Sequence, residues 1–276
     1  MYMVKVVIYT AITNDYDVLM QPECVPRGVD HICFTDDANL EGGVWDIRLL
    51  NECDSPRVQA FKPRILPHLY LKEYDYSIYV DGHLYIKSDL TELIKKSNSN
   101  IAAVNHNYRD CAYDEADAVV ENGRANAQVV RQQMNRYKSE GFPKSYGLSI
   151  NGILIRKHND KKVIEVMELW WEEFQRGAKR SQLSFEYALW KHGIPVDRLD
   201  ISRYNSKYFK KFWHKPTGIL GDVYEFRINA FQNYAQSRHK IYIYYFYFIY
   251  SFFTVLLYMS SGRVTALSGL IFSKLR

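Results

Sequence analysis

Short apolar runs alternate with longer helical patterns along most of this chain of 276 residues. The runs are four to eight residues long and rich in β-branched and aromatic side chains, which is typical of buried strands. Strands that alternate with helices predict an α/β layered domain whose sheet is mixed and mostly parallel, with helices on its faces. We expect strands at 4–9, 31–35, 45–50, 76–80, 101–104, 152–155 and 196–201, and helices at 55–70, 113–140, 160–176 and 182–192.

The end of one expected strand carries a carboxylate and an imidazole two residues apart. The run Tyr76–Val80 stops at Asp81-Gly82-His83, and Gly82 permits a tight backbone path between the two side chains. Asp81 and His83 supply oxygen and nitrogen ligands that suit Mn²⁺ or Mg²⁺. The same residues also suit an ordinary turn after a strand. A second strand ends in Asp36-Asp37, and ligands of α/β sheets bind at such strand ends, so Asp36 is a candidate for binding a cofactor.

Composition restricts the function little. The net charge of +5 is modest and suits an anionic substrate, a membrane surface or a nucleic acid. The four cysteines form no Cys-x-x-Cys pair, which favours reduced cytosolic thiols over a zinc site or a disulfide framework. The first residues read as a strand and carry no secretory signal pattern.

The C-terminal segment differs from the rest of the chain. Residues 241–262 contain no charged side chain and are rich in tyrosine and phenylalanine. A run of this length predicts a membrane-spanning helix, although the tyrosines also suit a helix in the plane of the membrane, or one packed on protein. We therefore divide the chain into a catalytic domain, 1–236, and a hydrophobic tail, 237–276. The basic stretch 207–240 places the domain on the cytoplasmic face of the membrane.

Four stretches together carry a resemblance to a known family: VVIYTAITNDYDVL, LPHLYLKEYDYSIYVDGHLYI, QMNRYKSEGFPKSYGLSINGILIRKHND and MELWWEEFQRGAKRSQLSFEYALWKHG. They cover most of residues 4–193 and resemble glycosyltransferases of the A-type (GT-A) fold, similar to family 8 and closest to the group called domain of unknown function 616. The resemblance implies a Rossmann-like GT-A sheet and transfer of a sugar from a nucleotide sugar, most simply a UDP-sugar, with Mn²⁺ or Mg²⁺. It implies a glycan or lipid-linked glycan of the cell envelope or surface as acceptor. We expect no nucleic-acid partner.

The resemblance also implies binding roles for individual residues. His214 would complete the metal site of Asp81 and His83. The uridine would lie at Tyr9, Thr10 and Ala11 at the end of the first strand. Basic side chains would grip the diphosphate, Arg in bidentate fashion; the candidates are Arg57, Lys62, Arg64 and Lys215.

The catalytic roles follow from the same resemblance. Asn151 would face the donor sugar, and Gln182 would stabilise a developing oxocarbenium ion or orient the acceptor. Glu186 and Asp110 are the carboxylates that we name as a base, and since neither stands out, transfer with retention of configuration is favoured.

The chain also departs from the family pattern. Ser181 stands where the family has Asp, Ile150-Asn151 where it has an acidic residue, and His83 where the second carboxylate of Asp-x-Asp stands. These departures keep open an inactive, membrane-tethered binding or scaffolding protein. A nucleotidyltransferase-like enzyme is the other alternative, but it normally has a glycine-rich loop after the first strand, and TAITNDYD has none.

Overall fold

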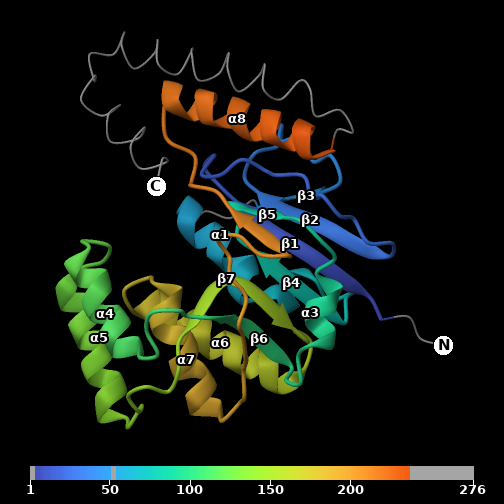
Figure 1. The fold of residues 1–276 in the computed structure, drawn as a ribbon. Helices are drawn as coiled ribbons and strands as arrows, with labels where there is room; N and C mark the ends of the chain where they lie inside the picture. The colour runs from blue at the N-terminus through green and yellow to red at the C-terminus, as the bar shows by residue number, and fades with distance from the viewer. Residues whose placement is uncertain (1–3, 51–53, 237–276) are drawn as a thin grey trace. The chain divides into compact units, whose positions relative to one another are not determined.

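The computed structural model of the chain describes residues 4–50 and 54–236 (Figure 1). A seven-stranded sheet has the order β3-β2-β1-β4-β7-β6-β8, and β7 runs antiparallel to both of its neighbours while the other pairings are parallel. The mixed, mostly parallel sheet predicted from the sequence is confirmed. Two further strands, β5 and β9, pair antiparallel in a small second sheet. The strands are β1 (Val6–Ile12), β2 (Val29–Thr35), β3 (Asp46–Leu49), β4 (Tyr76–Val80), β5 (Leu84–Ile86), β6 (Ile101–Asn105), β7 (Ser149–Arg156), β8 (Asp197–Leu199) and β9 (Phe209–Lys211).

Helices flank the sheet, as Figure 1 shows, and two apolar clusters fill its faces. Alternate residues of a strand point to opposite faces, so Tyr9 packs in one cluster with Trp170 and Phe185, while Ile8 packs in the other. A third cluster lies among α4, α5 and α7. The helices are α1 (Pro56–Ile65), α2 (Pro67–Tyr70), α3 (Thr91–Lys95), α4 (Ala112–Glu121), α5 (Ala127–Ser139), α6 (Lys161–Arg176), α7 (Ser181–His192) and α8 (Ile219–Gln236).

Several local details differ from the sequence prediction, and the helix predicted over 113–140 is divided into α4 and α5. The helix predicted over 55–70 breaks at Leu66, whose φ of −112° and ψ of 55° are not helical. Proline disfavours the helical conformation of the residue before it, so Pro67 causes the break, whereas Pro63 lies inside α1. The first strand also runs on to Ile12, because its ladder with β2 continues through Ala11↔Phe34 and Ile12↔Thr35. The strand therefore does not end at Tyr9.

The direction of the strands gathers many loops at one edge of the sheet. Strands β1, β2, β4, β6 and β8 all end at this edge, and β7 begins there because it runs the opposite way. The loops at 13–17, 36–37, 81–83, 106–110, 145–148 and 200–203 consequently share what we call the carboxyl edge. Ligands of α/β sheets bind at such an edge.

A buried arginine joins β7 to β1 and to the end of α1. Arg156 is fully buried, and its guanidinium donates to the carbonyl oxygens of Arg64 (2.8 Å) and Ile65 (3.5 Å) and to the hydroxyl of Tyr9 (2.5 Å). The Tyr9 hydroxyl in turn donates to the carbonyl of Pro63 at 3.1 Å. The last carbonyls of a helix have no partner within the helix, so these side chains satisfy the C-terminal turn of α1.

The chain divides into two compact units, residues 1–214 and residues 215–276. Helix α8 belongs to the second unit, whereas the sequence sets the domain boundary at residue 236. The predicted tail, 237–276, lies outside the described residues. Within the residues that the structure describes, no helix combines the length and the apolar character needed to cross a membrane.

We predict that Arg156→Met lowers the free energy of unfolding by about 3 kcal/mol, because it leaves buried acceptors at the end of α1 without a donor. Denaturant unfolding measures the change. Lys157→Met is the matched control, since Lys157 is the exposed neighbour and the same substitution there should change stability by less than about 0.5 kcal/mol. Equal effects of the two substitutions would contradict the role given to Arg156.

Candidate functional site

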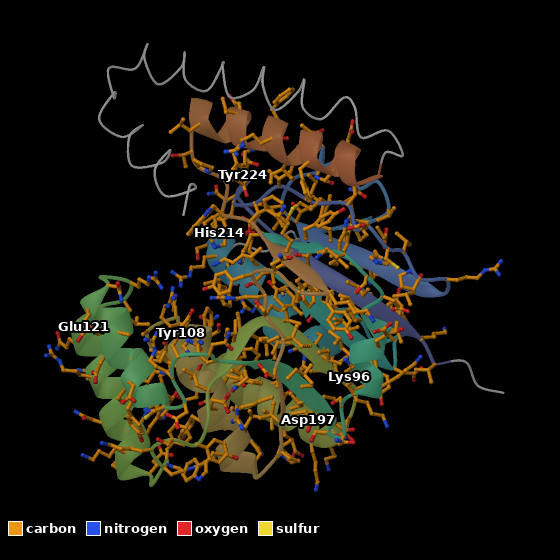
Figure 2. All side chains as sticks on the ribbon, viewed as in Figure 1. Lys96, Tyr108, Glu121, Asp197, His214 and Tyr224 are labelled. Carbon is orange, nitrogen blue, oxygen red and sulfur yellow. The ribbon has the colours of Figure 1, made fainter. Side chains whose placement is uncertain are left out.

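Three side chains with metal-binding atoms meet at the carboxyl edge. Asp17 comes from the loop after β1, His83 from the turn between β4 and β5, and His214 from the chain after β9 (labelled in Figure 2). One ligand atom of each lies within 4.8 Å of the others. Nδ1 of His214 lies 2.9 Å from Oδ1 of Asp17, and the rings of His83 and His214 are 4.3 Å apart. We call these three residues the Asp-His-His cluster.

The local fold explains why residues far apart in sequence meet here. The small sheet pairs Leu84 with Lys211, and the Phe212 amide donates to the His83 carbonyl at 2.8 Å, so the chain leading to His214 runs beside His83. Gly82 permits the approach of Asp17. A Cβ atom at Gly82 would lie 3.1 Å from Cβ of Asp17 and 2.9 Å from a side-chain atom of Ile12.

The surroundings set the charges of the two histidines. Burial lowers the pKa of His83 to about 4, helped by the nearby His214 and opposed by Asp81. The hydrogen bond to Asp17 raises the pKa of His214. Nδ1 of His83 is buried and has no hydrogen-bond partner within the described residues. His83 is therefore neutral at pH 7, which is the form of histidine that binds metal ions.

Asp81, the carboxylate expected to bind the metal, makes other contacts. Its Oδ1 accepts a hydrogen bond from the Tyr79 hydroxyl at 2.9 Å and lies 3.3 Å from Nη1 of Arg64. Burial raises the pKa of Asp81, but Arg64, His83 and the tyrosine hydrogen bond together hold it below its usual value, so the group is ionised. The structure thus groups His83 and His214 with Asp17, and it pairs Asp81 with an arginine beside them.

Basic side chains gather near this cluster. Arg180 precedes α7, and burial together with Arg57 and Arg124 lowers its pKa. Burial and Arg203 likewise lower the pKa of Lys211. Within the described part of the chain, no hydrogen bond or ion pair engages the guanidinium of Arg180. Glu115 and Asp81 oppose these shifts only in part, and like charges held together favour the binding of an anion.

Two of the predicted catalytic residues lie on β7 and at the start of α7. The Asn151 side chain is buried, and both its Oδ1 and its Nδ2 have no partner among the described residues. Its carbonyl accepts a hydrogen bond from Arg64 at 2.5 Å. Nε2 of Gln182 donates to the Ser149 carbonyl at 3.0 Å. Arg64 thus links Asp81 to β7, and Gln182 links α7 to the start of the same strand.

Glu186 is buried with both carboxylate oxygens engaged. Oε1 accepts a hydrogen bond from the Ser149 hydroxyl at 2.6 Å, and Oε2 lies 2.5 Å from the guanidinium of Arg198. Asp110, the other carboxylate named as a base, is exposed before α4, and its carbonyl accepts from the amide of Gly147.

The residues expected to bind the nucleotide occupy varied positions. Tyr9 and Thr10 are buried in the sheet, and Ala11 is half-buried. Asp36 is exposed at the carboxyl edge, where both of its oxygens accept from the amide of Asn14, at 2.9 and 3.0 Å. This contact fixes the start of the loop that carries Asp17.

The basic residues expected at the diphosphate are also dispersed. Arg57 is exposed in the first turn of α1 and donates to the carbonyl of Lys179 at 3.0 Å, whereas Lys62 is half-buried on the same helix. Lys215 belongs to the second unit, where it pairs with Glu225 at 2.7 Å.

Sequence reasoning missed several residues of the carboxyl edge. All of them except Lys211, which ends β9, are charged side chains in a loop that follows a strand or precedes a helix. Asp17 follows the first strand in TNDYD, and Arg180 directly precedes Gln182. The missed residues are Asp17, Arg124, Arg180, Arg203 and Lys211.

Comparison with known proteins identifies the family. The model of the TOD1/MUCI70 glycosyltransferase-like domain matches residues 1–215. The chain belongs to this family. The sequence prediction of a glycosyltransferase is thereby confirmed at the level of the family. No curated protein matches the chain in sequence.

Solved structures with a similar chain path include three glycosyltransferases. Apo WbbM, a bifunctional glycosyltransferase, is 13% identical over 71% of this chain, with a TM-score of 0.44, and this chain covers 38% of its length. Mouse xyloside xylosyltransferase 1 is 10% identical, with 71% of this chain and 85% of that chain covered and a TM-score of 0.43. The galactosyltransferase LgtC, bound to donor and acceptor sugar analogs, is 10% identical, with coverages of 70% and 72% and a TM-score of 0.41.

We predict that Asn151→Leu raises the free energy of unfolding by about 1 kcal/mol, because a buried amide without partners costs about 1 to 3 kcal/mol. Thermal and denaturant unfolding measure the change. Asn105→Leu, an exposed substitution of the same kind on the neighbouring strand β6, should have little effect. A loss of stability in Asn151→Leu alone would show that the amide already has partners in the folded protein.

Proposed function

We propose that this protein is a metal-assisted glycosyltransferase of the GT-A type that uses a nucleotide-sugar donor, most simply a UDP-sugar. The observation that carries the proposal is the Asp-His-His cluster, which shares the carboxyl edge of the sheet with Arg180, a residue for which the described part of the chain shows no ion pair. Sugar transfer from such a donor requires that the leaving diphosphate be neutralised, and a divalent cation with nearby arginines supplies this charge.

The diphosphate would bind between the Asp-His-His cluster and the basic residues. Arg57 and Arg180 lie close enough to depress the pKa of Arg180, so an incoming phosphate would relieve their repulsion. A guanidinium binds phosphate oxygens in bidentate fashion, which fixes orientation as well as affinity. The cation, Mn²⁺ or Mg²⁺ in the general form of the proposal, would be held by the two histidines and a carboxylate. It would supply Lewis-acid stabilisation of the leaving phosphate.

The nucleoside would lie toward the ends of β1 and β2. Asp36 and the loop after β1 occupy this part of the carboxyl edge, and the Asp36–Asn14 contact orders it. Tyr9 and Thr10 would act from within the sheet by shaping the strand under the nucleoside, because their side chains are buried.

The sugar would lie over the start of β7. Asn151 offers a buried amide without partners among the described residues. Gln182 donates a hydrogen bond to the carbonyl of Ser149, which lies two residues before Asn151 on β7. Glu186 has no free carboxylate oxygen, so it suits the positioning of Ser149 better than the role of a base. Retention of configuration, in which the leaving phosphate takes the acceptor proton, is the mechanism that we propose.

The acceptor is proposed to be a glycan or lipid-linked glycan. Exposed aromatic rings lie in the loops of the carboxyl edge: Tyr16 is 57% exposed, Trp213 80%, and Tyr108 78% (labelled in Figure 2). Such rings offer flat apolar faces with polar margins, to which the C–H face of a sugar can pack. Attachment to the cytoplasmic face of a membrane through residues 241–262 remains a prediction from the sequence, and it would place the enzyme beside a lipid-linked acceptor.

One observation favours an inactive binding protein as the second candidate. Asp81, the first carboxylate of the Asp-x-Asp position, is paired with Arg64. Hydrolysis of a UDP-sugar by the full chain, measured with Mn²⁺ and with EDTA, separates the two candidates. We expect turnover that depends on the metal. Donor binding without turnover under both conditions would favour the inactive protein.

We predict that Arg180→Gln weakens binding of UDP by about tenfold to a hundredfold, because a hydrogen bond between charged groups contributes about 1.5 to 3 kcal/mol. Isothermal titration calorimetry measures the dissociation constant. Arg131→Gln removes an exposed arginine from α5 and serves as the control for net charge. If both variants bind UDP as the unmodified protein does, the diphosphate does not contact Arg180.

We predict that Gln182→Ala lowers kcat and kcat/KM of sugar transfer together, without a matching rise in KM for the donor. This pattern is expected of a contact made in the transition state. Steady-state kinetics with varied donor measure it. A rise in KM at unchanged kcat would instead mean that Gln182 serves ground-state binding.

A further inference from the structure

The structure distinguishes between two aspartates that could bind the metal together with the two histidines. Two carboxylates are candidates: Asp17, whose Oδ1 lies 2.9 Å from Nδ1 of His214, and Asp81, two residues before His83 in the same turn. Only Asp17 among them belongs to the cluster whose ligand atoms all lie within 4.8 Å of one another. We propose that Asp17, His83 and His214 bind one divalent transition-metal cation, with Asp17 in the place that the family resemblance gives to Asp81.

Geometry supports the assignment. Ligand atoms that share a cation at about 2.1 Å lie roughly 3 to 4 Å apart, so the cluster needs only a small contraction to close on an ion. The Asp17 side chain is 9% exposed and lies 2.9 Å from Nδ1 of His214. A cation between these groups would replace their present hydrogen bond with two coordinate bonds.

Asp81 is poorly placed to compete for the cation. Its Oδ1 is held by the Tyr79 hydroxyl and by Arg64. Its Oδ2 lies 2.5 Å from the position that a Cβ atom on Gly152 would occupy, so this oxygen packs against the β7 backbone. Coordination through Oδ1 would require the Arg64 pair to break, which costs free energy in a partly buried setting.

A second observation supports a ligand at this site. The His83 side chain is 5% exposed, and its Nδ1 is buried without a partner among the described residues. Buried ring nitrogens are normally hydrogen-bonded, so an orphaned one calls for an explanation. An imidazole nitrogen that has no hydrogen-bond partner can offer its lone pair to a cation.

The backbone around the cluster restrains the three ligands. The loop of Asp17 is tied to Asp36 through the Asn14 amide and packs on Gly82, where a Cβ would not fit. The pairing of β5 with β9 restrains His83 and the approach to His214. Ligands held from separate elements of a fixed scaffold lose little conformational freedom when the ion binds.

The ligand set also predicts which metal is chosen. Two imidazoles with one carboxylate suit first-row transition metals with open coordination positions, whereas Mg²⁺ prefers oxygen ligands and keeps its waters. We therefore expect Mn²⁺ to bind at least about tenfold more tightly than Mg²⁺. The open positions would receive the donor diphosphate, and in this respect alone the inference rests on the proposed function.

Metal binding to the full chain without donor tests the assignment. Electron paramagnetic resonance of free Mn²⁺ gives the dissociation constant, and pulsed measurements detect coupling of bound Mn²⁺ to imidazole nitrogen. Asp17→Asn should weaken Mn²⁺ binding by about tenfold or more. Asp15→Asn removes the same charge two residues away, at a φ of 51° that Asn tolerates, and should change affinity less than about threefold, as should Asp81→Asn.

Several outcomes would overturn the inference. They are an absence of nitrogen coupling, equal losses in Asp17→Asn and Asp15→Asn, a greater loss in Asp81→Asn than in Asp17→Asn, or Mg²⁺ competing as well as Mn²⁺. If Asp17→Asn does not fold, the nitrogen coupling of the unmodified protein and the affinity of His214→Gln, a half-exposed position, decide the question. Tight Mn²⁺ binding at the cluster without UDP-sugar turnover would refute the proposed function and leave the metal assignment intact.

Discussion

The buried guanidinium of Arg156 is the contact on which the geometry of the site depends. It holds the C-terminal turn of α1 against the sheet by donating to the last carbonyls of that helix and to Tyr9. Burial lowers the pKa of Arg156, and hydrogen bonds to several acceptors compensate for the lost hydration. Because Arg64 lies in this turn, its side chain is directed to Asp81 and to the start of β7. Arg57, one helix length earlier, is brought to the carboxyl edge by the same anchoring.

The antiparallel direction of β7 brings the polar residues at its start to the carboxyl edge. In an all-parallel sheet the start of this strand would lie at the opposite edge. Here Asn151 lies next to Gly152, whose carbonyl accepts a hydrogen bond from the Asp81 amide at 2.8 Å. The start of α7 is tied to the same strand through Gln182 and Glu186. Charged side chains from α1, from the turn after β4 and from the start of α7 therefore lie near the start of the antiparallel strand β7.

The sequence predicts what local pattern determines. The runs of β-branched and aromatic residues predict seven strands of the main sheet with small errors at their ends, because period and composition act over a few residues. The β5–β9 pair was missed: each strand has three residues, and only long-range pairing defines them. The same pairing brings His214 beside His83, so the proximity of these two residues could be predicted only from the family resemblance. Asp17 escaped prediction because its approach depends on the missing Cβ of Gly82, a contact that no spacing in the sequence reveals. The first strand runs three residues beyond its predicted end at Tyr9, so Tyr9 lies within the sheet.

Several polar groups at this edge are left without the partners that folded proteins normally provide. The amide of Asn151 and Nδ1 of His83 are buried without hydrogen bonds among the described residues, and the Arg180 guanidinium is crowded by other arginines. Each arrangement lowers stability, since buried polar groups cost free energy when unpaired and like charges repel. Elsewhere in the same unit buried carboxylates are paired, as Glu173 is with Arg136 and Tyr137. Ring nitrogens of His31 and His68 are also buried without hydrogen bonds among the described residues, so the edge is distinguished by having three different unpaired groups together. An unpaired amide, imidazole and guanidinium at one edge present a hydroxyl-binding group, a metal ligand and a phosphate-binding group. These are the three kinds of contact that a nucleotide sugar with its cation would satisfy.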